Sequence, residues 1–385
     1  MKRIVIFLTV FLVLIPISTS IASTPYFQGL GDLPEDFSSK AYGISGDGQV
    51  VVGVSQNEAI YRNEAFYWTR ETGMVGMGDF PGRNFHSRAH ASSYDGSIIV
   101  GYGKPDWSGY QAFRWTTETG LDGLGHLPHD SSQFSFSNDV STDGSVVVGN
   151  SRGTLGTEAF MWTKSTGMIG LGHLSGGDES YYYSTAESVS GDGSVVVGVD
   201  NSTGHYKAYK WTKATGMTGL APEHSFSKAI DVSDDGDVIV GNYRRAFQTF
   251  AFRWTEEDGL VSLGEIPGHA TQNSTAYAIS ADGSIIVGGN NDWVGPYSGD
   301  QAFIWDEING MRNLQDMLEN DYNFDLDGWT LIDARGISDD GLTFTGTGIN
   351  PDGNTEAWIA TVPEPATSLL LCLGGLALRR KRKVN

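Results

Sequence analysis

Two segments of this 385-residue chain place aromatic side chains beside an aspartate, a pattern typical of sugar-binding loops. Aromatic rings stack on the apolar faces of sugars, and a small number of polar groups nearby fixes the orientation of the ligand. We therefore predict that Trp107, Tyr110, Trp293 and Tyr297 bind a ligand, either an exopolysaccharide or another surface protein. The alternative is that these aromatic side chains only pack against their local surroundings.

A second segment has the spacing of a calcium-binding loop. Asn323, Asp325 and Asp327 alternate and are followed by a glycine, as the first ligands of such loops do. The twelfth position, where such a loop carries a glutamate, is Ala334. Calcium is the one cofactor that the sequence suggests. The alternative is an elaborated loop with a short helix near residues 314–320.

Motifs of the common enzyme classes are missing from the sequence. There is no nucleophile elbow, no His-Glu-x-x-His zinc motif and no phosphate-binding loop, and the eight histidines do not cluster with metal-ligand spacing. We predict no catalytic residues and a non-enzymatic binding or structural role. A propeller-type glycan hydrolase or lyase is the alternative.

Net charge also limits the partners. The chain carries −21 overall, although seven of its 25 basic residues stand at the two ends, Lys2 and Arg3 at one and residues 379–383 at the other. The body between them is therefore more acidic still, and such a surface repels nucleic acid. The single cysteine, Cys372, allows no disulfide, so a hydrophobic core must hold the fold together.

The body consists of repeats of about 48 residues. Each repeat contains the pattern Ser-x-Asp-Gly, an apolar run that ends in Gly, and then a tryptophan segment that usually reads Ala-Phe-x-Trp. Asp-Gly pairs begin at Asp47, Asp95, Asp143, Asp192, Asp235, Asp282 and Asp340. The accompanying tryptophans are Trp68, Trp115, Trp162, Trp211, Trp254, Trp305 and Trp358. Self-similarity with this period indicates a repeat architecture.

Each repeat is predicted to contain four short strands. Runs such as residues 195–198, Val-Val-Val-Gly, are β-branched and suit a buried strand. Ser-x-Asp-Gly suits a type I turn that is followed by a left-handed glycine, so we interpret the repeated aspartate as a turn former rather than a ligand. Four-stranded units repeated seven times predict an all-β protein, a seven-bladed β-propeller over residues 24–361.

The ends of the repeat region predict how the ring closes. Residues 27–33 match the fourth strand of a unit, whereas residues 357–360 match the third strand. The N-terminal strand should therefore complete the last blade and leave no exposed sheet edge. An open β-solenoid, which does not need matched ends, is the alternative.

Both ends of the chain carry targeting signals. Residues 1–22 have the basic, apolar and small-residue order of a secretory signal peptide. Residues 362–385 begin with Val362, Pro363, Glu364 and Pro365, continue with a short apolar stretch, and end in a basic cluster. The apolar stretch of about 13 residues is shorter than the roughly 20 residues that a stable spanning helix needs. We predict a bacterial protein that is secreted or sorted to the cell envelope, with a transient membrane anchor.

Two resemblances to known families follow from these residues. Residues 362–385 resemble the PEP-CTERM sorting domain of bacterial surface proteins, which implies processing by an exosortase-type enzyme. The repeat, with its Ala-Phe-x-Trp, Leu-Gly-x-Leu and Ser-x-Asp-Gly patterns, resembles the extracellular HAF-type repeat. That second resemblance implies an extracellular location and no particular chemistry.

Overall fold

The computed structural model describes residues 25–81, 86–106, 109–128, 134–175, 183–221, 226–246, 248–268, 273–291 and 300–364. The chain divides into two units, Pro25–Val362 and a second unit formed by Met1–Thr24 with Pro363–Asn385. The predicted signal peptide and the tail beyond Glu364 lie outside the described residues. The first unit is considered by itself below.

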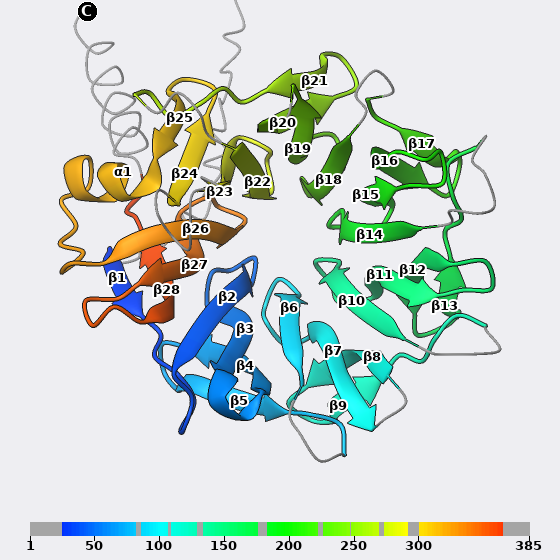
Figure 1. Cartoon of the computed structure of the whole chain (residues 1–385), viewed down its shortest axis with the longest axis horizontal. Helices are drawn as coiled ribbons and strands as arrows, with labels where there is room; N and C mark the ends of the chain where they lie inside the picture. The colour runs from blue at the N-terminus through cyan, green and yellow to red at the C-terminus, as the bar shows by residue number, and fades with distance from the viewer. Residues whose placement is uncertain are drawn as a thin grey trace, which may run out of the picture. The chain divides into compact units, whose positions relative to one another are not determined.

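Seven antiparallel sheets of four strands each form a ring around a central axis, as Figure 1 shows. The first strands surround the axis: β2 (Ser38–Ile44), β6 (Arg88–Ser92), β10 (Ser135–Val140), β14 (Ser184–Val189), β18 (Ser227–Val232), β22 (Asn273–Ile279) and β26 (Thr330–Ile337). The second strands follow outward: β3 (Val50–Asn57), β7 (Ile99–Asp106), β11 (Val146–Arg152), β15 (Val195–Asp200), β19 (Ile239–Arg245), β23 (Ile285–Asn291) and β27 (Thr343–Ile349).

The outer half of each blade is shorter. The third strands are β4 (Arg62–Thr69), β8 (Gly109–Thr116), β12 (Thr157–Thr163), β16 (Lys207–Thr212), β20 (Gln248–Thr255), β24 (Gln301–Asp306) and β28 (Thr355–Thr361). The fourth strands are β5 (Gly73–Gly78), β9 (Gly120–Gly123), β13 (Gly167–Gly170), β17 (Gly216–Gly219), β21 (Gly259–Ser262), β25 (Gly310–Asn313) and, in the seventh blade, β1 (Tyr26–Gly29). The predicted seven-bladed β-propeller is thus confirmed, and the solenoid alternative is wrong.

The N-terminal strand closes the ring as predicted. β1 pairs antiparallel with β28, from Tyr26 opposite Thr361 to Gly29 opposite Trp358. The ring of Phe27 also lies 5.4 Å from that of Trp329 and 6.2 Å from that of Trp358. Because both strands of this closure belong to Pro25–Val362, the propeller completes its sheets without any other part of the chain.

The core lies between neighbouring blades rather than within one sheet. One cluster joins Val52 and Ala65 of the first blade to Ile99 and Phe113 of the second. The aromatic residue after the repeated alanine is fully buried in every blade: Phe66, Phe113, Phe160, Tyr209, Phe252, Phe303 and Trp358. Truncating a buried aromatic side chain typically costs about 3–5 kcal/mol, so this position carries much of the packing between blades.

The Ser-x-Asp-Gly segments form the predicted turns. In the third blade the hydroxyl of Ser141 donates to Asp143 Oδ1 at 2.9 Å, the amide of Ser145 donates to the same oxygen, and Gly144 has φ +71°. These turns also bond to one another around the axis. The amide of Thr142 donates to the carbonyl of Gly191 at 3.1 Å, and similar bonds continue until the amide of Asp339 reaches the carbonyl of Gly46 at 2.9 Å.

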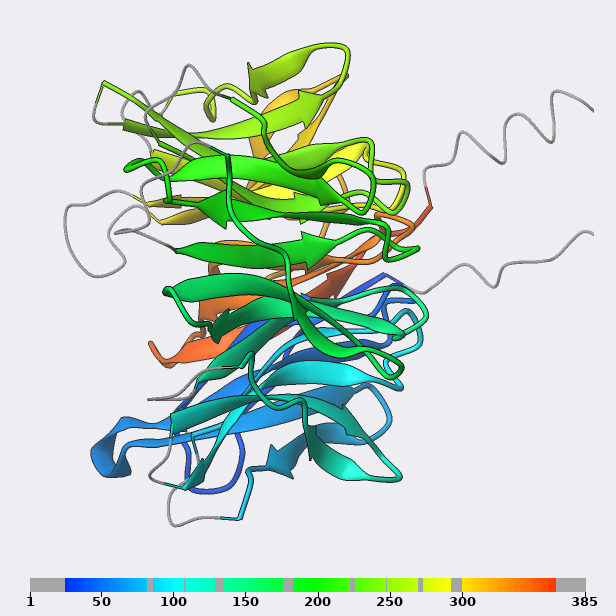
Figure 2. The same ribbon diagram turned by 90° about the vertical axis from the view of Figure 1, so that its right-hand side faces the viewer.

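We call the side with these turns the turn face and the opposite side the loop face; Figure 2 shows the ring edge-on between them. The loop face carries the connections between second and third strands, including the 3-10 helix η1 (Glu58–Ile60), and those that enter the next blade. The insertion in the seventh repeat forms α1 (Leu314–Asn320), where Asn313 caps the helix by accepting from the amide of Asp316 at 3.0 Å. The predicted short helix is confirmed. No helix among the described residues is long and apolar enough to cross a membrane.

Candidate functional site

A β-bulge in each first strand builds the wall of the central channel. The register shifts by one residue in every pairing of a first with a second strand. A bulge lets two consecutive side chains face the same side of a sheet. The bulged residues that line the channel are Tyr42, His90, Asn138, Glu187, Ile230, Tyr277 and Arg335. The residues after them also line it: Gly43, Ala91, Asp139, Ser188, Asp231, Ala278 and Gly336.

These two rings enclose a hollow of about 400 Å³ at the loop face, which we call the channel mouth. The bulged residues differ from blade to blade, whereas the turn and core residues repeat. Bulges often re-aim side chains next to functional sites. A varied polar ring at one end of a regular scaffold is therefore the strongest candidate for a functional site in this molecule.

One side of the channel mouth is aromatic. The ring of His90 lies 5.7 Å from that of Tyr42 and 5.3 Å from that of Tyr102. Tyr102 in turn lies 4.7 Å from Phe136 and 5.3 Å from Tyr110. We call these five side chains the aromatic wall. Burial lowers the pKa of His90 to about 4, so the imidazole is neutral at pH 7 and its Nδ1, 3.1 Å from the carbonyl of Ser137, can donate there.

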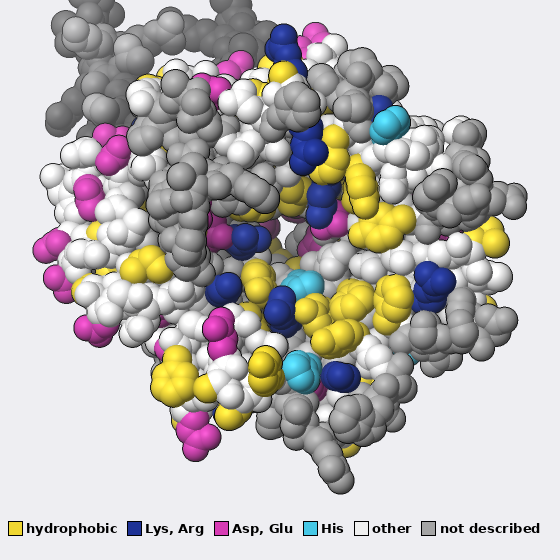
Figure 3. All heavy atoms as spheres, viewed as in Figure 1, with side chains coloured by type: hydrophobic (Ala, Val, Ile, Leu, Met, Phe, Trp, Pro, Cys, Tyr) yellow, Lys and Arg dark blue, Asp and Glu magenta, His cyan; other side chains and the backbone are white. Residues whose placement is uncertain are grey.

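Basic side chains gather around the channel mouth, although the chain as a whole is acidic. Figure 3 shows Lys and Arg side chains around the central opening of this face. Arg335 donates through Nε to Asp333 at 2.7 Å and stacks on Tyr277 at 4.3 Å, and Lys228 Nζ lies 3.0 Å from a carboxylate oxygen of Glu187. Arg88 also lines the hollow, and no described residue forms a hydrogen bond or an ion pair with its side chain.

A pair of carboxyl groups lies at the base of the channel mouth. The hydroxyl of Ser188 is 2.7 Å from Asp139 Oδ2 and 2.7 Å from Asp231 Oδ1. Burial raises the pKa of Asp139 to about 6. Burial and the charge of Asp139 raise the pKa of Asp231 to about 7. We call this group the carboxyl bridge.

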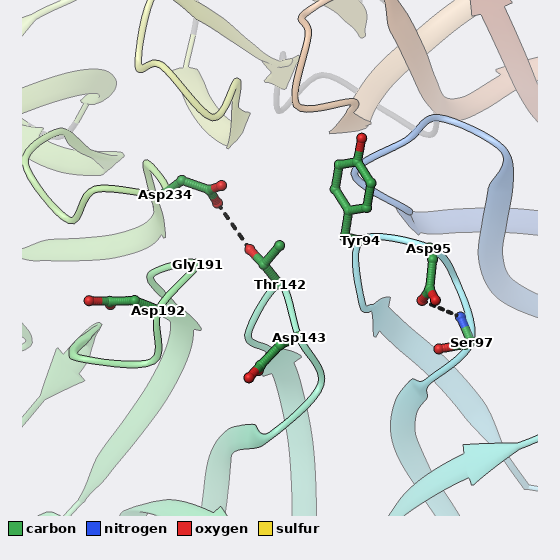
Figure 4. Close-up of a pocket in the computed structure, with 8 residues that line it drawn as sticks. All are labelled: Tyr94, Asp95, Ser97, Thr142, Asp143, Gly191, Asp192 and Asp234. Carbon is green, nitrogen blue, oxygen red and sulfur yellow. Dashed lines mark hydrogen bonds between the residues drawn. The ribbon is translucent and has the colours of Figure 1, made fainter.

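The turn face has a different chemistry. A hollow of about 600 Å³ there is lined by turn residues that include Asp95, Asp143, Asp192 and Asp234. Figure 4 shows these side chains. Hydrogen bonds from Ser145 hold the pKa of Asp143 below its ordinary value, which fits the predicted role in the turn. Asp234 stands one place before a turn aspartate, and burial raises its pKa. No group of three or more His, Cys, Asp or Glu side chains in the described part of the chain is arranged to hold a metal ion.

The predicted ligand-binding residues fall at the loop face or outside the described residues. Tyr110, in β8, belongs to the aromatic wall. Trp107, Trp293 and Tyr297 lie outside the described residues, so their part in the predicted site stays a prediction.

The predicted calcium segment forms a turn. Asp325 Oδ1 accepts from the amide of Asp327 at 3.1 Å, and Asn323 and Asp327 have φ of +56° and +49°. A calcium ion at Asn323, Asp325 and Asp327 stays a prediction.

Sequence reasoning missed Arg88, Asp139, Ser188, Asp231 and Arg335. A signal was present, because Arg335 and the three bridge residues occupy two adjacent positions of the repeat where residue type changes from unit to unit. The predicted ligand-binding residues instead lie in loops, where insertions also vary. The bulge, which turns both of these positions toward the axis, was not predicted.

Comparison with known proteins agrees with the C-terminal signal. The family model of the PEP-CTERM protein-sorting motif matches residues 361–383. This match implies recognition by an exosortase and export to the cell envelope. Of the four motif residues, Val362 is buried and Glu364 exposed, whereas Pro365 lies outside the described residues. A search of curated proteins gives no match. The resemblance of the repeat to the HAF type stays a prediction.

Solved structures share the fold. An oligogalacturonate lyase from Vibrio parahaemolyticus is similar with a TM-score of 0.55 and 12% identity, over 89% of this chain and 98% of that chain. An oligogalacturonate lyase in complex with manganese gives a TM-score of 0.54 at 12% identity over the same shares. TolB from Acinetobacter baumannii gives a TM-score of 0.47 at 13% identity. The match covers 68% of this chain and 62% of the TolB chain, so this chain spans less than two thirds of the length of TolB. At such identities the likeness concerns the fold alone.

Proposed function

We propose that this chain is an exported cell-surface or extracellular-matrix protein with a non-enzymatic binding role, and that a saccharide is its ligand. The PEP-CTERM tail delivers it, and an exosortase-type enzyme processes the tail, which anchors the protein in the membrane only until then. The ligand occupies the channel mouth. Another surface protein as the partner is the less favoured form of this proposal.

The aromatic wall is the observation that carries the saccharide proposal. Tyr42, His90, Tyr102, Tyr110 and Phe136 form a connected group of aromatic rings, and Tyr42 and His90 of this group line the hollow of about 400 Å³ beside polar side chains. The rings meet edge to face, and an exposed aromatic face with a few polar groups beside it suits a sugar ring, whose faces are apolar and whose edges carry hydroxyls. The predicted loop residues Trp107, Trp293 and Tyr297 follow β7 and β23 in the sequence, and the proposal includes them in the ligand-binding site.

One experiment tests both delivery and binding. The full chain is produced in a bacterium that has an exosortase, and the exported protein is recovered, sequenced at both ends by mass spectrometry and applied to a glycan array. We expect a mature protein without residues 1–22 and without the basic C-terminal cluster, and binding to a subset of glycans. An intact basic cluster on the exported protein would contradict processing, and an empty array would contradict saccharide binding.

Variants locate the binding surface. Tyr110→Ala, Trp107→Ala and Trp293→Ala should each weaken glycan binding about tenfold, because each removes a stacking ring. Tyr94→Ala is the matched control, since Tyr94 is 47% exposed but lines the hollow of the turn face. Equal binding by all four variants would rule out the loop face as the site.

A glycan hydrolase or lyase is the second candidate, and the carboxyl bridge favours it. Two carboxyl groups with raised pKa values in one hollow resemble the acid and base pairs of such enzymes. The shared fold with oligogalacturonate lyases is compatible with this candidate. Release of shorter or unsaturated products from any glycan that binds would make the protein an enzyme and overturn the non-enzymatic role.

A further inference from the structure

Ser188 stands between two carboxyl groups that it cannot satisfy alone. Its Oγ lies 2.7 Å from Asp139 Oδ2 and 2.7 Å from Asp231 Oδ1. A serine hydroxyl carries one hydrogen and therefore donates to one acceptor at a time. The other short contact needs a hydrogen from the carboxyl side. Both short contacts are satisfied best when one proton is held on Asp139 or Asp231.

Backbone amides hold both carboxyl groups in place. Asp139 accepts from the amides of Val140 at 2.8 Å and Val189 at 2.9 Å, and Asp231 accepts from those of Val232 at 2.8 Å and Ile279 at 2.9 Å. The bridge therefore ties the third, fourth, fifth and sixth blades together at the channel wall. The equivalent residues of the other three blades are Gly43, Ala91 and Gly336, which have no polar side chain. The proton site thus lies on one side of the channel.

Arg88 leaves a positive charge without a counterpart in the same hollow. Two neighbouring cations have partners, because Arg335 is bonded to Asp333 and Lys228 to Glu187. Arg88 lines the channel mouth and is half-buried, and its side chain forms no hydrogen bond or ion pair with any described residue. A half-buried guanidinium with its donors free is suited to a planar anionic group such as a carboxylate.

We propose that the channel mouth binds an anionic saccharide through Arg88, and that the carboxyl bridge takes up a proton from solvent when the anion enters. The inference rests on the proposed function and names the class of its ligand. A carboxylate or sulfate group on the sugar would sit on the guanidinium while the sugar rings lie on the aromatic wall. The added negative charge disfavours the ionised carboxyl of the bridge, which therefore binds a proton.

The other charges that face the bridge decide the pH range of this effect. The titratable and basic residues that line the hollow are Tyr42, Arg88, His90, Glu187, Tyr277 and Arg335. Lys228 pairs with Glu187 and Asp333 with Arg335, and β2 also carries Lys40. From the turn face Asp234 and Asp339 also act, and burial raises the pKa of Asp339 to about 6. The pKa of His90, about 4, leaves it neutral above pH 5. Affinity should therefore increase as the pH falls from 8 to 6.

The first test separates the charge of the ligand from its sugar rings. The propeller, residues 25–362, is titrated with uronate oligosaccharides and with their methyl esters, which have the same rings without the charge. We expect the acids to bind at least tenfold more tightly, and Arg88→Gln to remove that preference. Arg245→Gln is the matched control, because Arg245 is an exposed arginine at the end of β19 on the same face.

The outcomes of this test distinguish the two proposals. Equal binding of acids and esters would overturn the anionic ligand and leave saccharide binding intact. Binding of neither form would overturn the proposed function itself. An unchanged preference in Arg88→Gln would place the anion elsewhere.

The second test measures the proton directly. Calorimetric titration at pH 7 in two buffers of different ionisation enthalpy gives the number of protons taken up on binding. We expect a clear uptake by the wild-type propeller, a smaller one by Asp231→Asn, and an unchanged one by Arg245→Gln. Circular dichroism establishes that each variant is folded. Anion binding without any proton uptake would contradict the proposal that the carboxyl bridge binds a proton when the anion enters.

Discussion

Two aspartates of the third blade, four residues apart, have opposite pKa shifts. Asp143 stands in an exposed turn, where hydrogen bonds from Ser145 hold its pKa below the ordinary value. Asp139 faces the channel, where burial raises its pKa to about 6. An aspartate therefore stabilises a turn at position 143 and binds a proton at position 139. The difference comes from the backbone, because the bulge turns Asp139 inward.

The raised pKa of Asp231 predicts a pH-dependent effect of its substitution. The pKa of Asp231 is about 7 in the folded protein and lies above the ordinary value of 3.8. The folded protein therefore binds this proton more tightly than the unfolded chain does. The stability of the wild type consequently decreases as the pH rises from about 4 to about 7. The Asp231→Asn variant loses one side-chain oxygen that accepts from a backbone amide, at every pH, but its side chain never ionises. Relative to wild type its free energy of unfolding should rise by on the order of 2 kcal/mol between pH 4 and pH 8.

Urea unfolding at several pH values measures this difference, and Asp143→Asn is the control with the opposite sign. The lowered pKa of Asp143 contributes stability that is present above pH 4 and lost as pH falls through its folded pKa. The free energy of unfolding of the wild type should therefore increase relative to that of Asp143→Asn as the pH rises to 4. A pH-independent difference for Asp231→Asn would show that its carboxyl group is ionised throughout.

At the scale of the element, the bulge of the first strand explains the glycine that ends each apolar run. A Cβ built on Gly149 of β11 would lie 2.0 Å from the carbonyl oxygen of Phe136 in β10. The bulge brings this carbonyl inward, and only a residue without a side chain leaves room for it. The repeated glycine is thus a requirement of the strand pairing that presents Asn138 and Asp139 to the channel.

Gly149→Ala should therefore destabilise the propeller strongly. The clash is with backbone, which cannot rotate away, so we expect a loss on the order of 3 kcal/mol. Gly219→Ala in β17 is the matched control, since its Cβ would meet only a leucine side chain at 3.9 Å. Thermal unfolding of the two variants compares them. If both melt alike, the close approach in the third blade is not needed for stability.

For the whole molecule, closure of the ring should decide stability. β1 covers the edge of β28 and packs the partly buried Phe27 against two tryptophans. A protein that starts at residue 31 loses this strand and exposes a sheet edge. We expect its Tm to fall by on the order of 10 °C and its tendency to aggregate to increase, compared with a protein that starts at residue 25. Differential scanning calorimetry and light scattering compare the two; identical melting would mean that the seventh blade is stable with three strands.

The sequence by itself determined the repeat, the number of blades, the turns and the closing strand. These features depend on local patterns: Ser-x-Asp-Gly specifies a turn through the hydroxyl of Ser141 and the left-handed glycine, and alternating apolar runs specify strands. The closure was predictable because the strand types at the two ends are complementary. The C-terminal motif is read by an enzyme as a linear signal, so it too is visible in sequence alone.

Only the tertiary structure decided the site. Asp139 and Asp231 lie 49 and 43 residues from Ser188, and no local pattern links them. They meet because the ring brings equivalent positions of successive blades to one axis, and because a bulge shifts the alternation of side chains by one residue. Burial in the channel then sets their pKa values. Position and protonation therefore depend on contacts between blades, which exist only once the propeller has closed.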